Sequence, residues 1–338
     1  MEKRETKSGT GIKLAKQLNS GIFDKPELGS TRDGFGEAML ELGAKDKRVW
    51  ALCADLTESV KLHAFQNKFP ERFVECGVAE QNTVTVASGL AAVGKIPYAA
   101  SFATFIPGRC WEQIRTTICY NDVPVKIVGG HAGITTGDDG ATHQAIEDIA
   151  TMRAIPNMVV VVPCDKEEMR KATIAAANVD KPVYLRMGRD KVVTLTKKTT
   201  PFKIGKAEIF VEGKDVVLVA CGRMVYEALV AARELADQGI SAKVINCHTV
   251  KPLDSKTLVA AAKSCGAVVT CEEHNIMGGL GGAVAELLSE ECPVPIVRVG
   301  VRDVFGESGK PGELMKKYGL TSSDIAKAAR KAIGNKRK

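Results

Sequence analysis

The sequence lacks long apolar runs and has few aromatic residues. Its longest apolar stretches, such as "MVVVV" at 158–162, have the length of a strand, whereas a membrane-spanning helix needs about 18 apolar residues. The N-terminal segment has no apolar core of the signal-peptide kind. Phe, Trp and Tyr together make up 5% of the chain, so a pair of neighbouring aromatic residues needs an explanation. We therefore expect a cytoplasmic protein that does not enter a membrane.

The ten cysteines lack the spacing of a metal site. No two of them are closer than Cys265 and Cys271, so the C-x-x-C pattern of zinc sites is absent. They lie in apolar segments such as "WALCAD" and "VVTCEE", which favours buried thiols in a reducing compartment over a disulfide framework. None stands beside a histidine in a known motif, so a cysteine nucleophile is disfavoured.

The excess of basic residues is modest and mostly dispersed. The formal net charge is +7, and basic residues gather only in the tail "KAARKAIGNKRK". Such a tail is usually a solvated end, whereas nucleic-acid binding needs a basic patch or stripe. A modest positive balance also suits small anionic substrates such as sugar phosphates, because it raises their local concentration. Charge alone does not decide between these two classes of partner.

The order of apolar segments predicts two α/β domains. Residues 1–29 are polar and marked by Gly and Pro, which indicates an extended arm. In residues 30–190 strand-like and helix-like segments alternate, which predicts a parallel sheet covered by helices on both faces. Residues 191–206 break this rhythm and are predicted to be a linker, and 207–338 form a smaller second alternation. In such folds ligands bind at the carboxyl ends of the strands.

The segment "ECGVAEQNTVTVASGLAAVG", residues 75–94, places Glu80 in the first turn of a helix that leaves a strand. One interpretation is that the carboxylate only complements the positive end of the helix dipole. The other is that Glu80 belongs to a site. Asp55 also ends a predicted strand, and a glycine-rich loop follows "PVKIV", so three strand ends of one domain carry polar residues.

The loop "HAGITTGDDGATHQ", residues 131–144, holds His131, Asp139 and His143, and we expect His143 to open the next helix. Its spacing matches no standard metal signature, although His and Asp are possible metal ligands. A purely structural turn is a second interpretation. The third is an active-site loop, because imidazoles and a carboxylate suit hydroxyl recognition and proton transfer.

Two further motifs have a structural and a functional interpretation. Phe102 and Phe105 in "SFATF" are either core residues or a stacking wall for a flat heteroaromatic ring. The segment "EEHNIMGGLGGAVAELL" has the strand-turn-helix form of a phosphate-binding turn, but no register satisfies G-x-G-x-x-G. We interpret it as close helix-sheet packing, with a weak anion site as the lesser alternative.

Five motifs together resemble the pyrimidine-binding half of transketolase, in the family's order: "STRDGFGEAM", "CADLTESV", "GVAEQN", "SFATF" and "HAGITTGDDGATHQ". The resemblance runs from about Ser30 to the C-terminus. It implies a parallel-sheet domain that binds the aminopyrimidine of thiamine diphosphate, followed by a smaller C-terminal α/β domain. The family's diphosphate and magnesium signature, G-D-G followed at a distance by Asn, does not occur here. The resemblance therefore implies one subunit of a split enzyme.

The resemblance also implies a role for individual residues around the cofactor. Glu80 would bind a pyrimidine nitrogen and drive the shift to the imino tautomer that activates the cofactor. Phe105 would stack on the pyrimidine, and Phe102 would line its pocket. The other matched residues are Asp55 and Leu56 near the cofactor at the subunit junction, and Asp139 and His143 at the hydroxyls of the donor sugar, with His143 placed for proton transfer.

A second set matches the family's phosphate site at the mouth of the channel. Its members are Arg32, Ser59, His131 and Arg189, with Arg186 as the alternative to Arg189 if the register in "LRMGRDK" differs. One departure from the family is Gly108, which stands where many members carry a third aromatic residue. That side of the pyrimidine pocket is therefore expected to be looser.

The resemblance favours a transketolase subunit that transfers a two-carbon ketol unit between phosphorylated sugars. It implies a partner chain that carries the diphosphate-binding domain and holds Mg²⁺ or Ca²⁺, in a dimer of heterodimers, with neither nucleic acid nor a membrane as partner. Half of a deoxyxylulose-phosphate synthase and the β subunit of a 2-oxoacid dehydrogenase are the alternatives within the fold. A non-catalytic homologue is the alternative from another class, but it would not need Glu80, Asp139 and His143.

Overall fold

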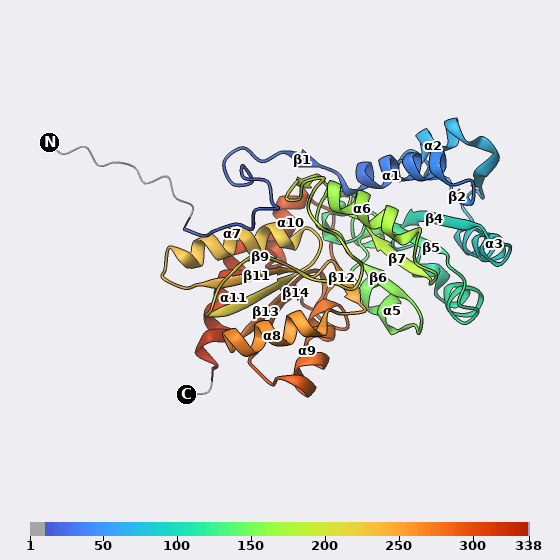
Figure 1. Cartoon of the computed structure of the whole chain (residues 1–338). Coiled ribbons are helices and arrows are strands. Elements are labelled where there is room, and N and C mark those ends of the chain that lie inside the picture. Colours follow the sequence, from blue (N-terminus) through green and yellow to red (C-terminus); the bar gives the residue numbers. More distant parts are fainter. Residues whose placement is uncertain (1–10, 337–338) are drawn as a thin grey trace.

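Two mainly parallel sheets organise residues 11–336, which are the residues described by the computed structural model (Figure 1). The first sheet has seven strands in the order β12-β6-β7-β5-β4-β2-β3, and the second has five in the order β14-β13-β10-β11-β9. Only the edge strands β12 and β9 run antiparallel to their neighbours in these sheets. The predicted fold class, two α/β domains with mainly parallel sheets, is confirmed.

The first sheet is built from short, buried strands rich in β-branched and small residues. Its strands are β2 (Val49–Cys53), β3 (Phe73–Glu75), β4 (Ile96–Phe102), β5 (Lys126–Gly130), β6 (Val159–Val161), β7 (Val183–Arg186) and β12 (Thr249–Lys251). Its helices are α1 (Thr31–Lys45), α2 (His63–Lys68), α3 (Glu80–Ala92), α4 (Trp111–Gln113), α5 (Asp148–Ala154) and α6 (Lys166–Ala176). Because side chains alternate along a strand, α1 and α6 cover one face, with Phe35 and Met169 in its core, and α3 and α5 cover the other, with Val84 and Met152.

The second sheet follows the same plan. Its strands are β9 (Glu208–Val211), β10 (Val216–Ala220), β11 (Ala242–Asn246), β13 (Val268–Asn275) and β14 (Ile296–Val301). Its helices are α7 (Met224–Ala236), α8 (Ser255–Cys265), α9 (Leu280–Glu291), α10 (Pro311–Lys317) and α11 (Ser322–Gly334). Side chains of α8 and α9 belong to the same apolar cluster as side chains of α3 and α5. The two domains therefore meet in an apolar core to which both contribute.

Several local predictions differ from the structure. The helix expected from His143 begins at Asp148, because residues 141–143 form a separate 3₁₀ turn and Ala145 pairs with Ala132 in an isolated bridge. A π-helical segment, Ile114–Cys119, directly follows α4. Strand β12, which follows β11 of the second domain in sequence, joins the edge of the first sheet.

The part of the predicted arm that the structure describes is packed against both domains. Leu18 and Ile22 are 3% and 1% exposed and lie in the apolar core of the second domain. Leu28 and Gly29 form β1, which pairs with β8 (Val192–Val193). In the sequence, β8 lies between β7 of the first large sheet and β9 of the second. Residues 1–10 of the predicted arm and 337–338 of the predicted second domain lie outside the described residues.

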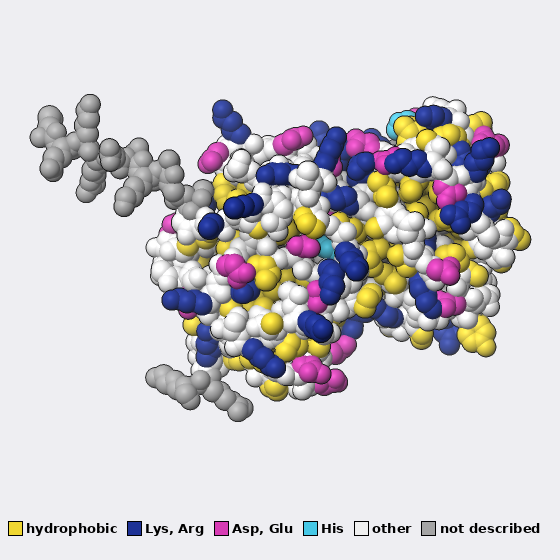
Figure 2. Space-filling view, in the orientation of Figure 1, with side chains coloured by type: hydrophobic (Ala, Val, Ile, Leu, Met, Phe, Trp, Pro, Cys, Tyr) yellow, Lys and Arg dark blue, Asp and Glu magenta, His cyan; other side chains and the backbone are white. Residues whose placement is uncertain are grey.

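The surface of the molecule is mixed in charge. Figure 2 shows Lys and Arg side chains interspersed with Asp and Glu over the face that is drawn, without one basic stripe. The ten cysteines are all free, and eight of them are buried. Between residues 11 and 336, no helix combines the length and apolar character that crossing a bilayer requires.

Candidate active site

Glu80 is the first residue of α3 and is 2% exposed. Its Oε2 accepts a hydrogen bond from Arg109 Nη1 at 3.1 Å, and the Arg109 side chain is half-exposed. The preceding residue, Ala79, has no side chain that could cap the helix. Among the hydrogen bonds of residues 11–336, no backbone amide donates to the Glu80 carboxylate. Glu80 is therefore a buried carboxylate at a strand-to-helix turn with most of its acceptor capacity unused.

Four rings cluster beside this carboxylate. The Phe102 and Phe105 rings are stacked, with centroids 6.0 Å apart and an interplanar angle of 11°. The His131 ring stacks on Phe102 at 3.7 Å, and the His143 ring meets Phe105 edge to face at 5.4 Å. The Arg109 guanidinium lies 4.4 Å from the centre of the Phe105 ring. The structure thus brings the predicted aromatic pair and both loop histidines together, and Arg109 joins this cluster to Glu80.

The proposed phosphate residues also lie together. Arg32 Nη1 donates to Ser59 O at 3.0 Å, and Arg32 Nη2 donates to Arg189 O at 2.8 Å. Arg189 Nη1 donates to the Asp139 carboxylate at 3.1 Å. Arg32 Nε is buried without a partner. Two guanidinium groups and a serine from three segments of the chain therefore meet next to Asp139.

Arg186 does not belong to this group. Its side chain is buried, with Nε 2.7 Å from Asp148 Oδ2, and it also donates to Glu273 O. Burial alone would raise the pKa of the Asp148 carboxyl, but the Arg186 guanidinium outweighs burial and holds that pKa below its ordinary value. Arg186 is thus half of an internal ion pair, and Arg189 is the arginine that accompanies Arg32.

His131 is an electrically neutral member of the site. Burial, followed by the nearby Arg32 and Arg189, lowers the pKa of His131 to about 3. Its side chain is 3% exposed, its backbone has a positive φ of 54°, and its Nδ1 is buried without a hydrogen-bond partner. A buried polar atom without a partner is costly in a folded protein. The ring therefore presents an unused nitrogen among basic groups, which suits an anionic ligand.

Asp55 and Leu56 lie at the end of β2, on the turn toward Ser59. Asp55 has a positive φ of 57°, and its N–H donates to Glu75 Oε1 at 2.8 Å. The same Glu75 oxygen accepts from Gly77 N at 3.0 Å, so Glu75 ties the ends of β2 and β3 together. Among the described residues, no hydrogen bond or ring contact links Asp55 or Leu56 to the four-ring cluster.

The loop from His131 to His143 is a set of short 3₁₀ turns, η4 (Ile134–Asp139) and η5 (Ala141–His143). Gly133, Gly137 and Gly140 all have a positive φ, which explains the glycine content of the loop. His143 Nδ1 lies 2.9 Å from Thr142 Oγ1. No group of three or more His, Cys, Asp or Glu within residues 11–336 is arranged to hold a metal ion.

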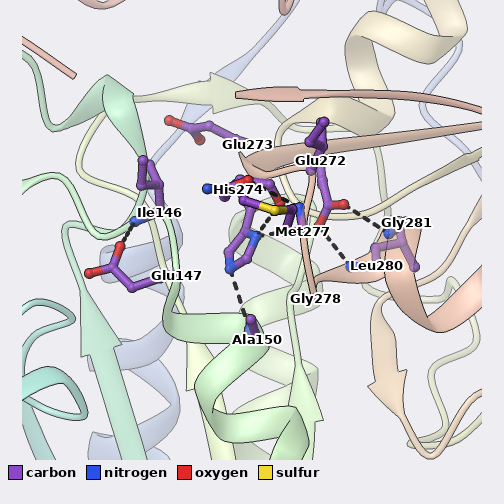
Figure 3. Close-up of polar contacts among 12 residues, drawn as sticks. Ile146, Glu147, Ala150, Glu272, Glu273, His274, Met277, Gly278, Leu280 and Gly281 are labelled. Atoms are coloured by element: carbon purple, nitrogen blue, oxygen red, sulfur yellow. Dashed lines mark hydrogen bonds and ion pairs between the residues drawn. The ribbon is translucent and has the colours of Figure 1, made fainter. Parts of the chain in front are cut away.

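The segment "EEHNIMGG" has a structural use for its first carboxylate (Figure 3). Glu272 accepts hydrogen bonds from the N–H groups of Leu280 and Gly281, at 2.7 and 2.8 Å, at the start of α9. The helix end considered as a weak anion site is thus occupied by a carboxylate of the chain itself. His274 Nε2 accepts from Ala150 N at 3.3 Å, which links β13 to α5 of the first domain.

Three residues of this region carry contacts that the sequence did not single out: Arg109, Glu75 and Glu273. Arg109 falls four residues after Phe105, one helical turn away, which is a local signal that could have been used. Glu75 bonds to Asp55, which is distant in sequence, and to Gly77 across a turn. Glu273 bonds to Thr135 of the loop that begins at His131. No spacing rule in the sequence identifies either glutamate.

The fold and the site define a class of protein: a two-domain α/β chain with a buried carboxylate and an aromatic wall at its strand ends. Residues 29–193 match the family model "Transketolase, pyrimidine binding domain", and residues 205–325 match "Transketolase, C-terminal domain". The chain belongs to the transketolase family.

Its relatives include separate subunits of the same extent. The chain is 47% identical to a putative transketolase C-terminal section of Methanocaldococcus jannaschii, over 88% of this chain and 94% of that protein. It is 45% identical to the 6-deoxy-6-sulfo-D-fructose transketolase subunit SqwH of Clostridium sp. (strain MSTE9), over 94% and 99%. A solved split-gene transketolase, described as an inactive β4 tetramer, superimposes with a TM-score of 0.86 at 49% identity, over 91% of this chain and 99% of the other.

Proposed function

We propose that this chain is the C-terminal subunit of a split transketolase. With a partner chain that carries the diphosphate-binding domain, it transfers a two-carbon ketol unit between sugars that end in an oxyanion. The supporting observation is Glu80, a carboxylate buried at the start of a helix, bonded among the described residues to no backbone amide, and joined through Arg109 to the Phe105 ring of the Phe102–Phe105 stack. A carboxylate that only balanced a helix dipole would not need this surrounding.

The residues present fit the pyrimidine half of thiamine diphosphate. Phe105 offers a ring face, Glu80 offers an acceptor for a pyrimidine nitrogen, and Phe102 closes the side of the pocket. The bound cofactor supplies a nucleophilic carbon for attack on the ketose carbonyl. Glu80 holds the hydrogen bond that favours the imino tautomer of the pyrimidine. His143 and Asp139 bind hydroxyl groups of the donor sugar, and His143 moves a proton at one of them.

The substrate class follows from the basic group of the site. Arg32 and Arg189 lie near the neutral His131, and arginine suits a tetrahedral oxyanion through its planar fork. SqwH is named for a sugar with a sulfonate, which has the same tetrahedral shape as a phosphate. We propose phosphorylated sugars as substrates, and a sulfonated sugar as the competitor that an assay must include.

Assembly and location belong to the same proposal. The partner chain binds Mg²⁺ or Ca²⁺ with the diphosphate, and the complex is a dimer of heterodimers. The solved β4 relative is inactive by its description, which supports the need for a partner. A cytoplasmic location is supported by the ten free thiols, which suit a reducing compartment.

The test is to assay the chain alone and together with the diphosphate-binding subunit of the same organism. Thiamine diphosphate, Mg²⁺, a ketose phosphate donor and ribose 5-phosphate are supplied in both cases. Only the assembled complex should transfer the ketol unit. Transfer by the homogeneous chain alone would overturn the split-enzyme proposal, and condensation of pyruvate with glyceraldehyde 3-phosphate would indicate a deoxyxylulose-phosphate synthase instead.

Arg32→Ala tests the substrate class within the active complex. A hydrogen bond to a charged group contributes about 1.5 to 3 kcal/mol, so kcat/KM for ribose 5-phosphate should fall by roughly 10- to 150-fold. Unphosphorylated acceptors should change little. Arg32 also donates to Ser59 O and Arg189 O, so the Tm of the variant is measured beside the kinetics. Equal losses for both acceptors would show that Arg32 supports the fold rather than the phosphate.

A further inference from the structure

Glu273 reaches from the second domain into the loop that carries His131, Asp139 and His143. It lies on β13 beside Glu272 and is 5% exposed. Figure 3 shows the two neighbouring carboxylates on opposite sides of the strand, as the alternation of side chains along a strand requires. Glu272 turns to α9 of its own domain, whereas Glu273 turns away from it.

The carboxylate of Glu273 makes two short contacts with one residue of the loop. Its Oε1 accepts a hydrogen bond from Thr135 N and another from Thr135 Oγ1, both at 2.7 Å. All of these atoms are buried, and the two residues are 138 positions apart in the chain. Loss of the acceptor would leave two buried donors unpaired, which is costly in a folded protein.

The loop is shaped to receive this carboxylate. A Cβ atom placed on Gly133 would lie 2.4 Å from Glu273 Cδ, and Gly133 has a positive φ of 87°. Both the close approach and the backbone conformation restrict this position to glycine. At the other end of the loop, Gln144 Nε2 donates to Glu307 O of the second domain at 2.9 Å. The second domain thus holds the loop near both ends.

The fixed threonine is directly followed by the residue that organises the proposed binding groups. Thr136 Oγ1 donates to His131 O, and Thr136 O accepts from Arg189 Nη1. Arg189 in turn pairs with Asp139 at 3.1 Å. A displacement of Thr135 would therefore shift the backbone of His131 and the guanidinium of Arg189 together.

We propose that Glu273 is a positioning residue for sugar binding: it holds the loop so that His131, Asp139 and Arg189 keep one arrangement. The substrate in this inference is taken from the proposed function. The contact between Glu273 and Thr135 does not depend on that function. It assigns to the C-terminal domain a direct part in shaping the site of the pyrimidine-binding domain.

Two substitutions at this position separate positioning from simple packing. The amide oxygen of Glu273→Gln can accept both hydrogen bonds from Thr135, whereas Glu273→Ala removes the acceptor. In the assembled complex, Glu273→Ala should raise KM for the phosphorylated acceptor about 10-fold or more and lower kcat less, and Glu273→Gln should stay within about threefold of the wild type. A residue that only stabilised the fold would lower Tm and the active fraction, hence kcat, without changing KM.

Glu286→Ala is the matched control. Glu286 is also a glutamate of the second domain that bonds to the first, through Arg153 at 2.6 and 2.7 Å, but it does not contact the loop. Its loss should leave KM unchanged. If Glu286→Ala raises KM as much as Glu273→Ala does, general loosening of the domain junction explains both, and the proposal fails.

Hydrogen exchange gives a readout that does not depend on activity. The amide of Thr135 should exchange at least about tenfold faster in Glu273→Ala than in the wild type or in Glu273→Gln, because its hydrogen bond is lost. Unchanged exchange together with an unchanged KM would overturn the inference. If the wild-type complex transfers no ketol unit, the proposed function fails, and the exchange experiment still decides whether Glu273 holds the loop.

Discussion

Glu80 and Glu272 are both buried carboxylates beside the N-terminus of a helix, but they are used in opposite ways. Glu80 is the first residue of α3, whereas Glu272 lies within β13 and its carboxylate reaches the start of α9. Glu272 gives one oxygen to the N–H of Leu280 and the other to that of Gly281. Glu80 receives only the half-exposed Arg109 in the part of the chain that the structure describes.

This difference separates capping from function at two carboxylates that both lie at a helix N-terminus. A carboxylate near a helix N-terminus is expected from the helix dipole alone, so position by itself says little. What distinguishes the two is the number of acceptor positions that the protein has already filled. Glu272 has both oxygens bonded to the first residues of α9, whereas Glu80 keeps acceptor capacity and is joined through Arg109 to the Phe105 ring, which suits a ligand.

The largest expected effect is that of Glu80→Gln on turnover. The amide keeps the size of the side chain but cannot stabilise the imino tautomer as a carboxylate does, so kcat of the assembled complex should fall by about 10²-fold or more. The free energy of unfolding should change by no more than about 1 kcal/mol, because the Arg109 pair is partly exposed. Kinetics and thermal unfolding are measured on the same preparation. Nearly full turnover with reduced stability would make Glu80 a second Glu272 and remove the contrast.

Glu272→Gln should show the reverse pattern. The amide has one oxygen for two buried N–H donors, and its NH₂ group would face the second donor, so unfolding should cost about 1 to 3 kcal/mol less. Turnover per folded complex should be unchanged. Thermal or denaturant unfolding of wild type and variant measures the difference, and an activity loss larger than the loss of folded protein would show that the capped helix also serves the site.

The pH dependence of that difference has a defined sign. Burial raises the pKa of the Glu272 carboxyl above its ordinary value. The stability linked to this group is therefore fully present below its unfolded pKa of about 4.5 and declines as the pH rises through the higher folded value. The wild type should exceed Glu272→Gln in stability by more at about pH 5 than at about pH 8. A constant difference would mean that Glu272 does not titrate differently in the folded chain.

The sequence predicted the elements that local patterns specify. The start of α3 at Glu80 and the strands that end before Asp55 and Glu80 are confirmed, because apolar periodicity and glycine mark them within a few residues. The helix predicted at His143 was wrong, since the glycine turns continue and only Asp148 begins regular α-helix.

Other features depend on partners far away in the chain. Nothing in the three residues of β12 shows that they leave the second domain for the first sheet. The burial of Leu18 and Ile22 depends on apolar residues from later in the chain that pack around them. The pairing of Glu273 with Thr135, and of Arg109 with Glu80, requires two segments to meet in space, and a single sequence has no local pattern for such a meeting.

The smallest expected effect concerns Arg109, the residue that keeps Glu80 from being wholly unpaired. Its guanidinium lies over Phe105 and donates to Glu80, and these are the two groups that we expect the pyrimidine to contact. A partly exposed ion pair and an exposed cation–π contact each contribute about 0.5 to 1 kcal/mol. Arg109→Ala should therefore tighten thiamine diphosphate binding to the assembled complex by about five- to thirtyfold, as measured by cofactor titration. Arg115→Ala is the control, because Arg115 makes no cation–π contact with these rings within residues 11–336, and it should leave binding unchanged. Weaker binding in Arg109→Ala would instead mean that Arg109 helps to hold the cofactor. Arg109 would then be a cofactor-binding residue and not a competitor of the cofactor for Glu80 and Phe105.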